Sequence, residues 1–330
     1  MPVISHHSCM FWSIAGRKRD KQASPKRSKE RRVAMKEKHQ QNKIPFWRNI
    51  KVVPYLYILP NMVLFLTFMI IPIFMTFYYS TVKWNGMGTP KFIDIQNYLY
   101  IFKDKVFLKS IFNTFYYAVA TVPLLMVVAL LFAVLLNNKI PLRGIIRSAI
   151  YAPAVVSTVV VGTVFTWIFQ DQLGLINYIL TSLGGTAIKW NNDPKFAMIM
   201  LIVATVWQRA GYNMVIYLAG LQGIPTDLME AATIDGASTW QRFRYITLPL
   251  LKNTHMFVMI TCMINAFRSF DLVYTMTQGG PLNATKTMVM YVYEQAFAKN
   301  YYGRAAAGGT VLFLFMVVLT LIRFKIEKED

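Results

Sequence analysis

Cysteine and histidine are scarce in this sequence. Its 330 residues contain two cysteines, Cys9 and Cys262, and four histidines, too few for a disulfide framework or a cysteine-based zinc site. The chain also has no Walker-type phosphate loop, zinc motif, nucleophile elbow or dinucleotide motif. We therefore expect that this chain is not an enzyme and that it binds no cofactor or metal.

Acidic residues are the next deficit, because 15 Asp and Glu stand against 35 Lys and Arg, a formal net charge of +20. Residues 1–51 hold 14 of the basic side chains but only Asp20, Glu30 and Glu37. Such a tail fits nucleic-acid binding or a disordered cytoplasmic arm against anionic lipid headgroups. Because no nucleic-acid-binding fold follows, we favour the lipid interpretation. A third interpretation is that translation starts at Met35, which leaves the tail without a function.

Hydrophobic residues, in contrast, make up 55% of the chain. A helix needs about 20 largely apolar residues to cross a bilayer, and six runs approach or exceed that length. The runs span residues 55–82, 111–136, 149–169, 196–221, 255–277 and 305–322. The sequence therefore predicts an all-α, polytopic membrane protein with six transmembrane helices.

The basic residues between these runs predict the orientation of the chain. With six spans both termini share one side, which carries 23 Lys and Arg against 10 on the other. We therefore expect both termini and the loop 222–254 to be cytoplasmic, although the sides nearly balance, at 9 and 10, without the tail. The predicted domains are a basic tail (1–50), a membrane domain (51–325) and a short cytoplasmic end (326–330).

The loop 222–254 is unusually polar for this part of the chain. Pro225 prevents continuation of the preceding helix, and Thr226 is placed to cap a new one. Asp227 and Glu230 fall in the first turn of that helix, where the helix dipole favours acids. Gly236 can then turn the chain with a positive φ angle.

A second short helix follows this turn. Ser238 and Gln241 match the capping-box pattern S-x-x-Q, and Trp240, Phe243 and Ile246 fall on one apolar face. We call residues 222–254 the elbow. By its physical properties alone, the elbow can either adsorb to lipid or sit in a groove of a partner protein.

The stretch "EAATIDGASTWQRFRYITLP" resembles the cytoplasmic EAA loop, E-A-A-x3-G-x9-I-x-L-P, of permease subunits of binding-protein-dependent ABC importers. The similarity covers roughly residues 50–325. "LAGLQGIPTDLMEAATIDGAS" is similar to the carbohydrate-uptake branch, and "MTQGGPLNATKTMVMYVYEQAF" to the maltose-transporter-type first permease. In this family the loop is a coupling helix that docks on an ATPase subunit. The residues that the resemblance assigns to coupling are Glu230, Ala231, Ala232, Asp235, Gly236, Trp240 and Phe243.

The resemblance also implies the partners and the location. The expected complex contains a second, homologous permease, two cytoplasmic ATPase subunits that bind ATP and Mg, and an extracellular solute-binding protein. The chain would lie in the cell membrane and carry a sugar or oligosaccharide by alternating access.

Charged side chains within the runs indicate a substrate pathway, because such charges face the interior of a helix bundle. Arg209, Arg268 and Asp271 qualify, and the last two can form an i, i+3 ion pair. These three residues can instead serve helix packing or reach headgroups. The resemblance, carried over by distance from its motifs, places the sugar-lining positions at Gln208, Tyr212, Asn213, Asn265, Arg268 and Ser269. The two arginines leave open an acidic sugar, such as a uronate oligomer.

Two other function classes remain as alternatives. An ion-driven secondary transporter requires buried acids in broken spans, and Asp271 is the one acid within a run. A membrane-embedded glycosyl-transfer enzyme requires paired carboxylates or a metal cluster at the surface, whereas the external loops offer isolated acids. Both alternatives are weaker than the importer permease.

Overall fold

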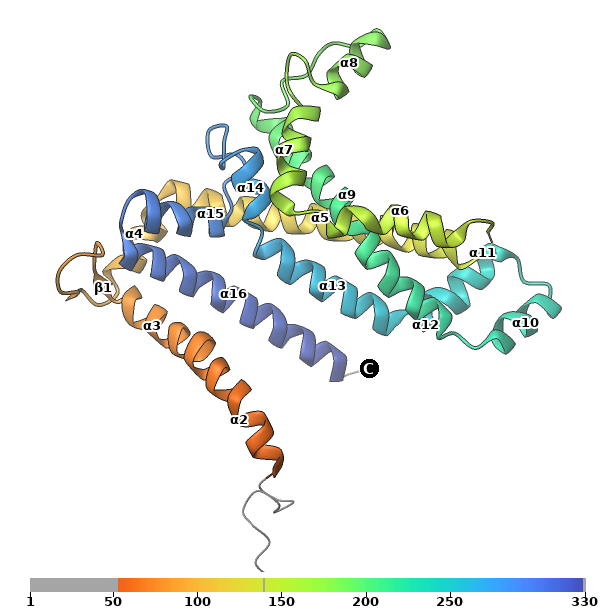
Figure 1. Cartoon of the computed structure of the whole chain (residues 1–330), viewed down its shortest axis with the longest axis horizontal. Coiled ribbons are helices and arrows are strands. Elements are labelled where there is room, and N and C mark those ends of the chain that lie inside the picture. The colour runs from red at the N-terminus through yellow and green to blue at the C-terminus, as the bar shows by residue number, and fades with distance from the viewer. Residues whose placement is uncertain (1–52, 139, 329–330) are drawn as a thin grey trace, which may run out of the picture. The chain divides into compact units, whose positions relative to one another are not determined.

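A computed structural model describes residues 53–138 and 140–328, so the predicted tail of residues 1–50 and residues 329–330 lie outside the described range. The chain falls into two compact units, one ending at Pro72 and the other beginning at Ile73. Almost all regular structure is helical (Figure 1). The all-α class predicted from the sequence is confirmed.

The described part of the first unit is an apolar helical segment. It consists of α2 (Val53–Phe65), the π-helical turn η2 (Leu66–Ile70) and the start of α3 (Ile71–Ser80). With the rest of α3 it forms the candidate span Val53–Ser80, which has 28 residues and a mean hydropathy of 2.2. The π-helical turn η2 ends two residues before Pro72. Proline has no backbone N–H group, so Pro72 cannot donate the regular helical hydrogen bond to the preceding turn.

The second unit contains the remaining elements. Its long helices are α5 (Lys105–Asn137), α9 (Pro194–Gln222), α13 (Lys252–Phe267) and α16 (Tyr302–Lys328). Between them lie α4 (Gln96–Lys103), α6 (Arg143–Val155), α7 (Thr158–Ile168), α8 (Leu175–Ser182), α14 (Asp271–Met276), α15 (Met288–Tyr293) and η4 (Glu294–Ala298). The two-residue strands β1 (Val82–Lys83) and β2 (Lys91–Phe92) pair antiparallel, with Val82 opposite Phe92. The elbow contains α10 (Thr226–Ile234), α11 (Thr239–Arg242), η3 (Phe243–Thr247) and α12 (Leu248–Leu250).

The prediction of six continuous spans is not confirmed. Within the described residues, four helices are long and apolar enough to cross a membrane, or five if α6 and α7 form one span. The predicted third span is bent by 97° between α6 and α7. The helix α6 ends at Val155, two residues after Pro153, which lies in its last turn. The predicted fifth span also breaks, because α13 stops at Phe267 and α14 starts at Asp271. No proline or glycine marks this second break in the sequence.

The core of the second unit lies where α9 packs along α5. Small side chains such as Ala129, Ala133 and Ala204 are completely buried and let the two helices approach closely. On the other side of α9, Gly211 meets α6, where an added Cβ atom would lie 2.1 Å from the Ile150 carbonyl oxygen. Position 211 therefore accepts only glycine in this arrangement.

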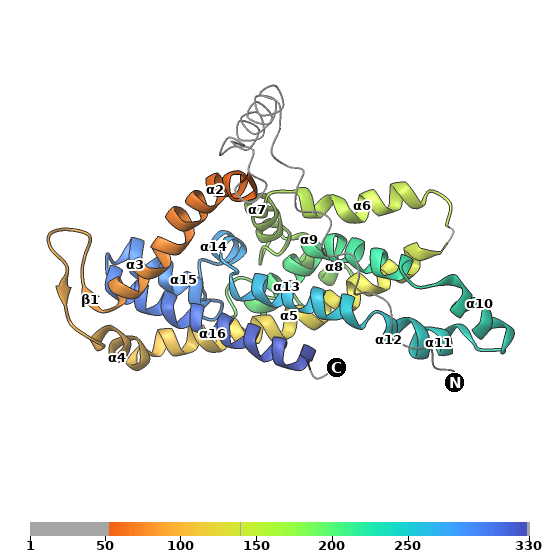
Figure 2. The same ribbon diagram turned by 90° about the horizontal axis from the view of Figure 1, so that it is seen from below.

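The elbow and the short outer elements occupy opposite ends of the second unit. Figures 1 and 2 both show α10 and α11 at one end and β1 and α4 at the other.

A third group, α8 and its flanking loops, is organised by Asn177, which is 2% exposed. Its amide donates to the carbonyls of Asp171 and Ile188 and accepts from the Ile188 amide and the Trp190 indole. All the hydrogen-bonding capacity of this side chain therefore holds one surface segment in place.

The connector between α14 and α16 is fixed to the start of α5 by polar contacts. Asn113 donates to the carbonyls of Asn283 (2.8 Å) and Lys286 (3.0 Å). Asp104, which caps α5 through the Val106 amide, also accepts a hydrogen bond from Tyr291. Burial and this contact with Asp104 raise the pKa of the Tyr291 hydroxyl. The connector is thus a fixed part of the fold.

Glu294 forms the ionic centre of the same connector. Its carboxylate pairs with Lys286 and, at 2.9 Å, with Lys299. Burial alone raises the pKa of Glu294, but the hydrogen bonds and charges of the two lysines outweigh that effect and hold the pKa below its ordinary value.

Acidification is therefore expected to loosen this connector. Because the pKa of Glu294 is lower in the folded chain, its stabilisation is complete above the ordinary value of about 4.3 and is lost as the pH falls through the folded value. Hydrogen exchange of residues 277–299, corrected for the intrinsic effect of pH, should show this loss of protection. Glu294→Gln should show weaker protection from exchange at neutral pH and no further loss of protection on acidification. The same loss of protection on acidification in Glu294→Gln would contradict the assignment.

Candidate functional site

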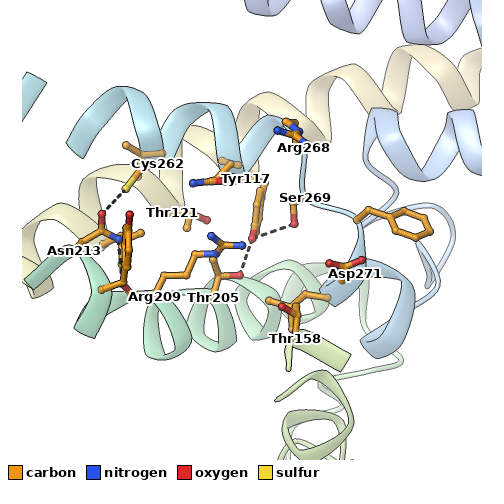
Figure 3. Close-up of a pocket in the computed structure, with 17 residues that line it drawn as sticks. Tyr117, Thr121, Thr158, Thr205, Arg209, Asn213, Cys262, Arg268, Ser269 and Asp271 are labelled. Carbon is orange, nitrogen blue, oxygen red and sulfur yellow. Dashed lines mark hydrogen bonds between the residues drawn. The ribbon is translucent and has the colours of Figure 1, made fainter. Parts of the chain in front are cut away.

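A cavity of about 200 Å³ lies in the second unit where the two helix breaks meet the long helices α5 and α9. Figure 3 shows its polar wall. Seven of the eight residues predicted for the pathway line this one cavity: Arg209, Tyr212, Asn213, Asn265, Arg268, Ser269 and Asp271. They come from α9, α13, the 268–270 break and α14, so the fold brings together two segments that are distant in the sequence.

Gln208, the eighth predicted residue, has a different position. It is 4% exposed and absent from the cavity wall. Its Nε2 donates to the Val156 carbonyl (3.2 Å) and to Thr158 Oγ1 (3.3 Å), on the two sides of the break between α6 and α7. Gln208 therefore does not line this cavity, because its amide satisfies a carbonyl freed by that break, and its place on the substrate pathway stays a prediction.

The helix α9 supplies one wall through a regular stripe. Thr205, Arg209 and Asn213 recur every four residues, and Tyr212 follows Arg209 by three, which places them on one face of the helix. Arg209 extends along the cavity, and Asn213 points to the facing helix α13 (Figure 3). There the Cys262 thiol donates to Asn213 Oδ1 at 3.4 Å.

The helix α5 supplies a second wall that the sequence analysis missed. The Tyr117 hydroxyl lies 2.6 Å from Thr205 Oγ1 and accepts from Ser269 Oγ at 3.4 Å, so it joins three segments (Figure 3). One turn further, Thr121 Oγ1 is buried in the cavity wall without a hydrogen-bond partner in the described chain. A signal existed, since Asn113, Tyr117 and Thr121 recur every four residues in an apolar run. Thr158, at the start of α7, completes the missed set.

The charges of the cavity are not paired with one another. Among residues 53–138 and 140–328, no ion pair joins Arg268 to Asp271, contrary to the possibility raised by their spacing. The reason is the helix break, which puts Arg268 at the end of α13 and Asp271 at the start of α14. Both side chains are exposed in the single chain. The cavity therefore offers two guanidinium groups, one carboxylate and several hydroxyl and amide groups to a ligand.

The elbow has the two-helix geometry expected from its sequence. Ser238 and Gln241 form the predicted capping box, with Ser238 N donating to Gln241 Oε1 at 2.7 Å. Gly236 has a φ of +77°, and the amide groups of Gly236 and Ala237 donate back to Thr233 and Ala232. These two bonds close the end of α10 in a Schellman motif.

Two details of the elbow differ from expectation. Thr226 is the first residue of α10 but does not cap it; its hydroxyl donates to the Asp227 carboxylate at 3.4 Å instead. Of the two acids expected in the first turn of α10, Asp227 lies there and Glu230 lies beyond it. Arg242 donates to Thr233 Oγ1 at 2.6 Å and ties α11 to α10. The elbow is consequently held by its own contacts.

The residues predicted for coupling form an accessible surface on this elbow. Glu230, Ala231, Asp235, Gly236 and Trp240 are exposed, and Ala232 and Phe243 are half-buried. The Trp240 ring contacts that of Phe243 at a centroid separation of 5.7 Å.

Comparison with known proteins identifies the class. Residues 100–328 match the family model described as the inner membrane component of binding-protein-dependent transport systems. The arabinooligosaccharides transport system permease protein AraP of Bacillus subtilis is 36% identical over 85% of this chain and 91% of its own length. The trehalose/maltose transport system permease protein MalF of Thermococcus litoralis is 34% identical over 83% of this chain and 93% of its own length.

A solved structure has the same fold. It is a bacterial ABC transporter involved in the import of the acidic polysaccharide alginate, with a TM-score of 0.75, 20% sequence identity, and coverage of 84% of this chain and 95% of that one. The present chain therefore belongs to the family of inner membrane components of binding-protein-dependent transport systems. It is a membrane permease subunit of an ABC importer, a class of transport proteins and not of enzymes. Neither alternative from the sequence, the ion-driven transporter or the glycosyl-transfer enzyme, gains support from these matches.

Gln208 and Asn265 provide a test that separates a fold-supporting amide from a cavity amide. Gln208→Leu leaves the Val156 carbonyl buried without its donor, which should destabilise the chain by about 1–3 kcal/mol. Asn265→Leu is the matched control, because the Asn265 side chain makes no hydrogen bond in the described part of the chain. The midpoint temperature of thermal unfolding in detergent should fall for Gln208→Leu alone. Sugar uptake by the intact complex should fall for Asn265→Leu without loss of stability. The reverse pattern would refute the assignment of Gln208.

Proposed function

We propose that the chain is the first permease of a heterodimeric ABC importer that carries a neutral sugar or short oligosaccharide. The observation that supports this most is the cavity wall, where Tyr117, Thr121, Thr205, Asn213 and Asn265 present hydroxyl and amide groups. Such groups beside aromatic side chains hold polyhydroxylated ligands. The names of the two relatives above, both more than 30% identical, refer to transport of arabino-oligosaccharides and of trehalose and maltose.

Asp271 offsets one of the two positive charges of the cavity, which leaves less attraction for an acidic ligand than two arginines alone would give. Arg209 and Arg268 would attract a carboxylate, but Asp271 lines the same small cavity and would repel it. For a neutral sugar all three side chains serve as hydrogen-bonding groups.

In this proposal the chain crosses the membrane six times, with the tail of residues 1–50, the membrane domain of 51–325 and the end at 326–330 as predicted. The third and fifth crossings are the broken pairs α6–α7 and α13–α14. Broken spans are favourable at a midplane binding site, because backbone freed from the helix lines a polar cavity there. Both termini and the elbow lie on the cytoplasmic side, and the basic tail faces anionic lipid.

A second permease would complete the cavity. Tyr212 is 47% exposed in the single chain, and Arg268 and Asp271 are exposed as well. Charged side chains are costly against lipid, so a homologous subunit is the expected cover for this side of the cavity. The extracellular binding protein on which this family depends would deliver the sugar to that shared site.

The elbow is the proposed contact with the ATPase. Two cytoplasmic ATPase subunits would bind ATP and Mg, and one of them would receive the elbow surface that includes Glu230, Ala232 and Trp240. An elbow fixed by the Ser238–Gln241 capping box and by Arg242 can pass on a displacement without bending. Alternating access then follows from a shift between inward-facing and outward-facing states.

Purification of the complex tests this function. We expect an ATPase and a second permease to co-purify with the chain, and we expect ATP-driven uptake of a neutral oligosaccharide after reconstitution with the binding protein. Purification without an ATPase would contradict the importer assignment. Uptake of a uronate oligomer in place of the neutral one would leave the importer standing but overturn the assignment of a neutral substrate.

Variants of the elbow test the coupling. Glu230→Lys reverses a charge on the proposed docking surface, and Gly236→Leu places a branched side chain at a φ of +77°. Both should leave the chain inserted and the ATPase active while sugar uptake falls, as measured by uptake per ATP hydrolysed. The matched controls are Asp227→Lys, a charge reversal on the same helix at an acid that is not among the predicted coupling residues, and Gly236→Asn, which tolerates positive φ. Normal uptake by both Glu230→Lys and Gly236→Leu would exclude the elbow as the lever.

A further inference from the structure

The two helices that flank the elbow touch each other directly beside it. A Cβ atom added to Gly220, near the end of α9, would lie 2.5 Å from Thr254 Oγ1 and 2.9 Å from Leu251 Cδ2, both near the start of α13. Leu251 is completely buried. A Cβ atom at these distances would force its neighbours to shift, so glycine at position 220 permits the close approach of the two helices.

One turn further from the elbow, the same two helices share a hydrogen bond. The Tyr217 hydroxyl lies 2.9 Å from His255 Nδ1, and the two rings meet edge to face with centroids 5.1 Å apart. Tyr217 is completely buried. Separating the helices at this point would leave a hydroxyl and a ring nitrogen without partners in apolar surroundings, which is costly.

The line of contact continues to the cavity. Asn213 of α9 and Cys262 of α13 are hydrogen-bonded to each other and both line the cavity. Positions 213, 217 and 220 are three or four residues apart and therefore share one face of α9. Seven residues of helix span about 10 Å, so these contacts cover the distance from the elbow to the cavity.

We propose that the Gly220–Thr254 crossing and the Tyr217–His255 hydrogen bond form a joint that makes α9 and α13 move as one body. A displacement of the elbow then reaches two walls of the cavity at once, through Arg209 and Asn213 on α9 and Cys262 and Asn265 on α13. Tyr217 and His255 are positioning residues in this arrangement, because they act on the cavity through the helices that carry them. The inference rests on the proposed coupling role of the elbow.

A cross-link across the joint gives the first test. Gly220→Cys together with Thr254→Cys places two thiols at the crossing, where an added Cβ at position 220 lies 2.5 Å and 3.1 Å from the two outer side-chain atoms of Thr254, close enough for a disulfide to form. If α9 and α13 move together, the oxidised complex should import sugar at the rate of the reduced complex. Single-cysteine variants in a Cys9→Ser background are the controls for other disulfides. Import that stops on oxidation and returns on reduction would overturn the joint.

Variants of the hydrogen bond give a second test that does not depend on the tolerance of position 220. His255→Leu removes the partner of Tyr217, whereas His255→Gln can still hydrogen-bond with it. We expect His255→Leu to lower the sugar imported per ATP hydrolysed, with ATPase activity retained, and His255→Gln to restore the ratio. A purely structural role would lower the amount of folded complex in His255→Leu without changing this ratio, and an unchanged ratio would refute the proposal.

The Glu230→Lys variant separates failure of the joint from failure of the elbow. If Glu230→Lys is uncoupled while His255→Leu has an unchanged ratio, the elbow couples but the joint is not its route. If both variants import normally, the proposed coupling role itself is wrong. The joint is supported when both are uncoupled and His255→Gln is not.

Discussion

The organisation of the cavity depends on one constraint: a backbone carbonyl released by a helix break in apolar surroundings must find another donor. Two helix breaks meet at the cavity, and at each break a freed carbonyl accepts a hydrogen bond from a side chain elsewhere in the chain. Gln208 of α9 donates to the Val156 carbonyl, and Thr287, before α15, donates to the Ser269 carbonyl at 3.1 Å. The polar residues that permit the breaks thus belong to the framework and are distinct from those that face the cavity.

This distinction explains why the cavity has a polar wall without buried ion pairs. The stripe on α9 and the pair Tyr117 and Thr121 on α5 face each other across a space that the bent spans leave open. Hydroxyl groups there satisfy one another, as Tyr117 and Thr205 do at 2.6 Å, or remain available, as Thr121 does within the described chain. An arrangement of this kind can exchange internal hydrogen bonds for bonds to a hydroxylated ligand at small net cost.

The features that sequence analysis predicted well are those set by local interactions. The elbow follows from residues within a few positions of one another, such as Ser238 with Gln241 and the positive φ of Gly236. Seven of the eight residues assigned to the substrate pathway line one cavity, but their role in transport stays a prediction. The break at 268–270 could not be predicted, because no proline or glycine occurs there. It depends on tertiary contacts, namely the hydrogen bond from Thr287 and the burial of Phe267. The role of Gln208 depends on α6, more than fifty residues away in the sequence, for the same reason.

The distribution of breaks along the spans also bears on how a movement would travel. From the elbow to the cavity, α9 and α13 are uninterrupted helices that are tied together at Tyr217 and His255. Beyond the cavity α9 continues without a break to Pro194, whereas α13 ends at Phe267. The piece that follows, α14, packs on α7, with Gly162 facing Thr275 so closely that an added Cβ would lie 2.9 Å from the Thr275 Cβ. A continuous helix carries a displacement along its length, whereas a break absorbs it in a few φ and ψ changes. A push at the elbow would therefore act on the cavity wall through both helices but continue beyond the cavity along α9 alone, because the break after Phe267 takes up the movement of α13.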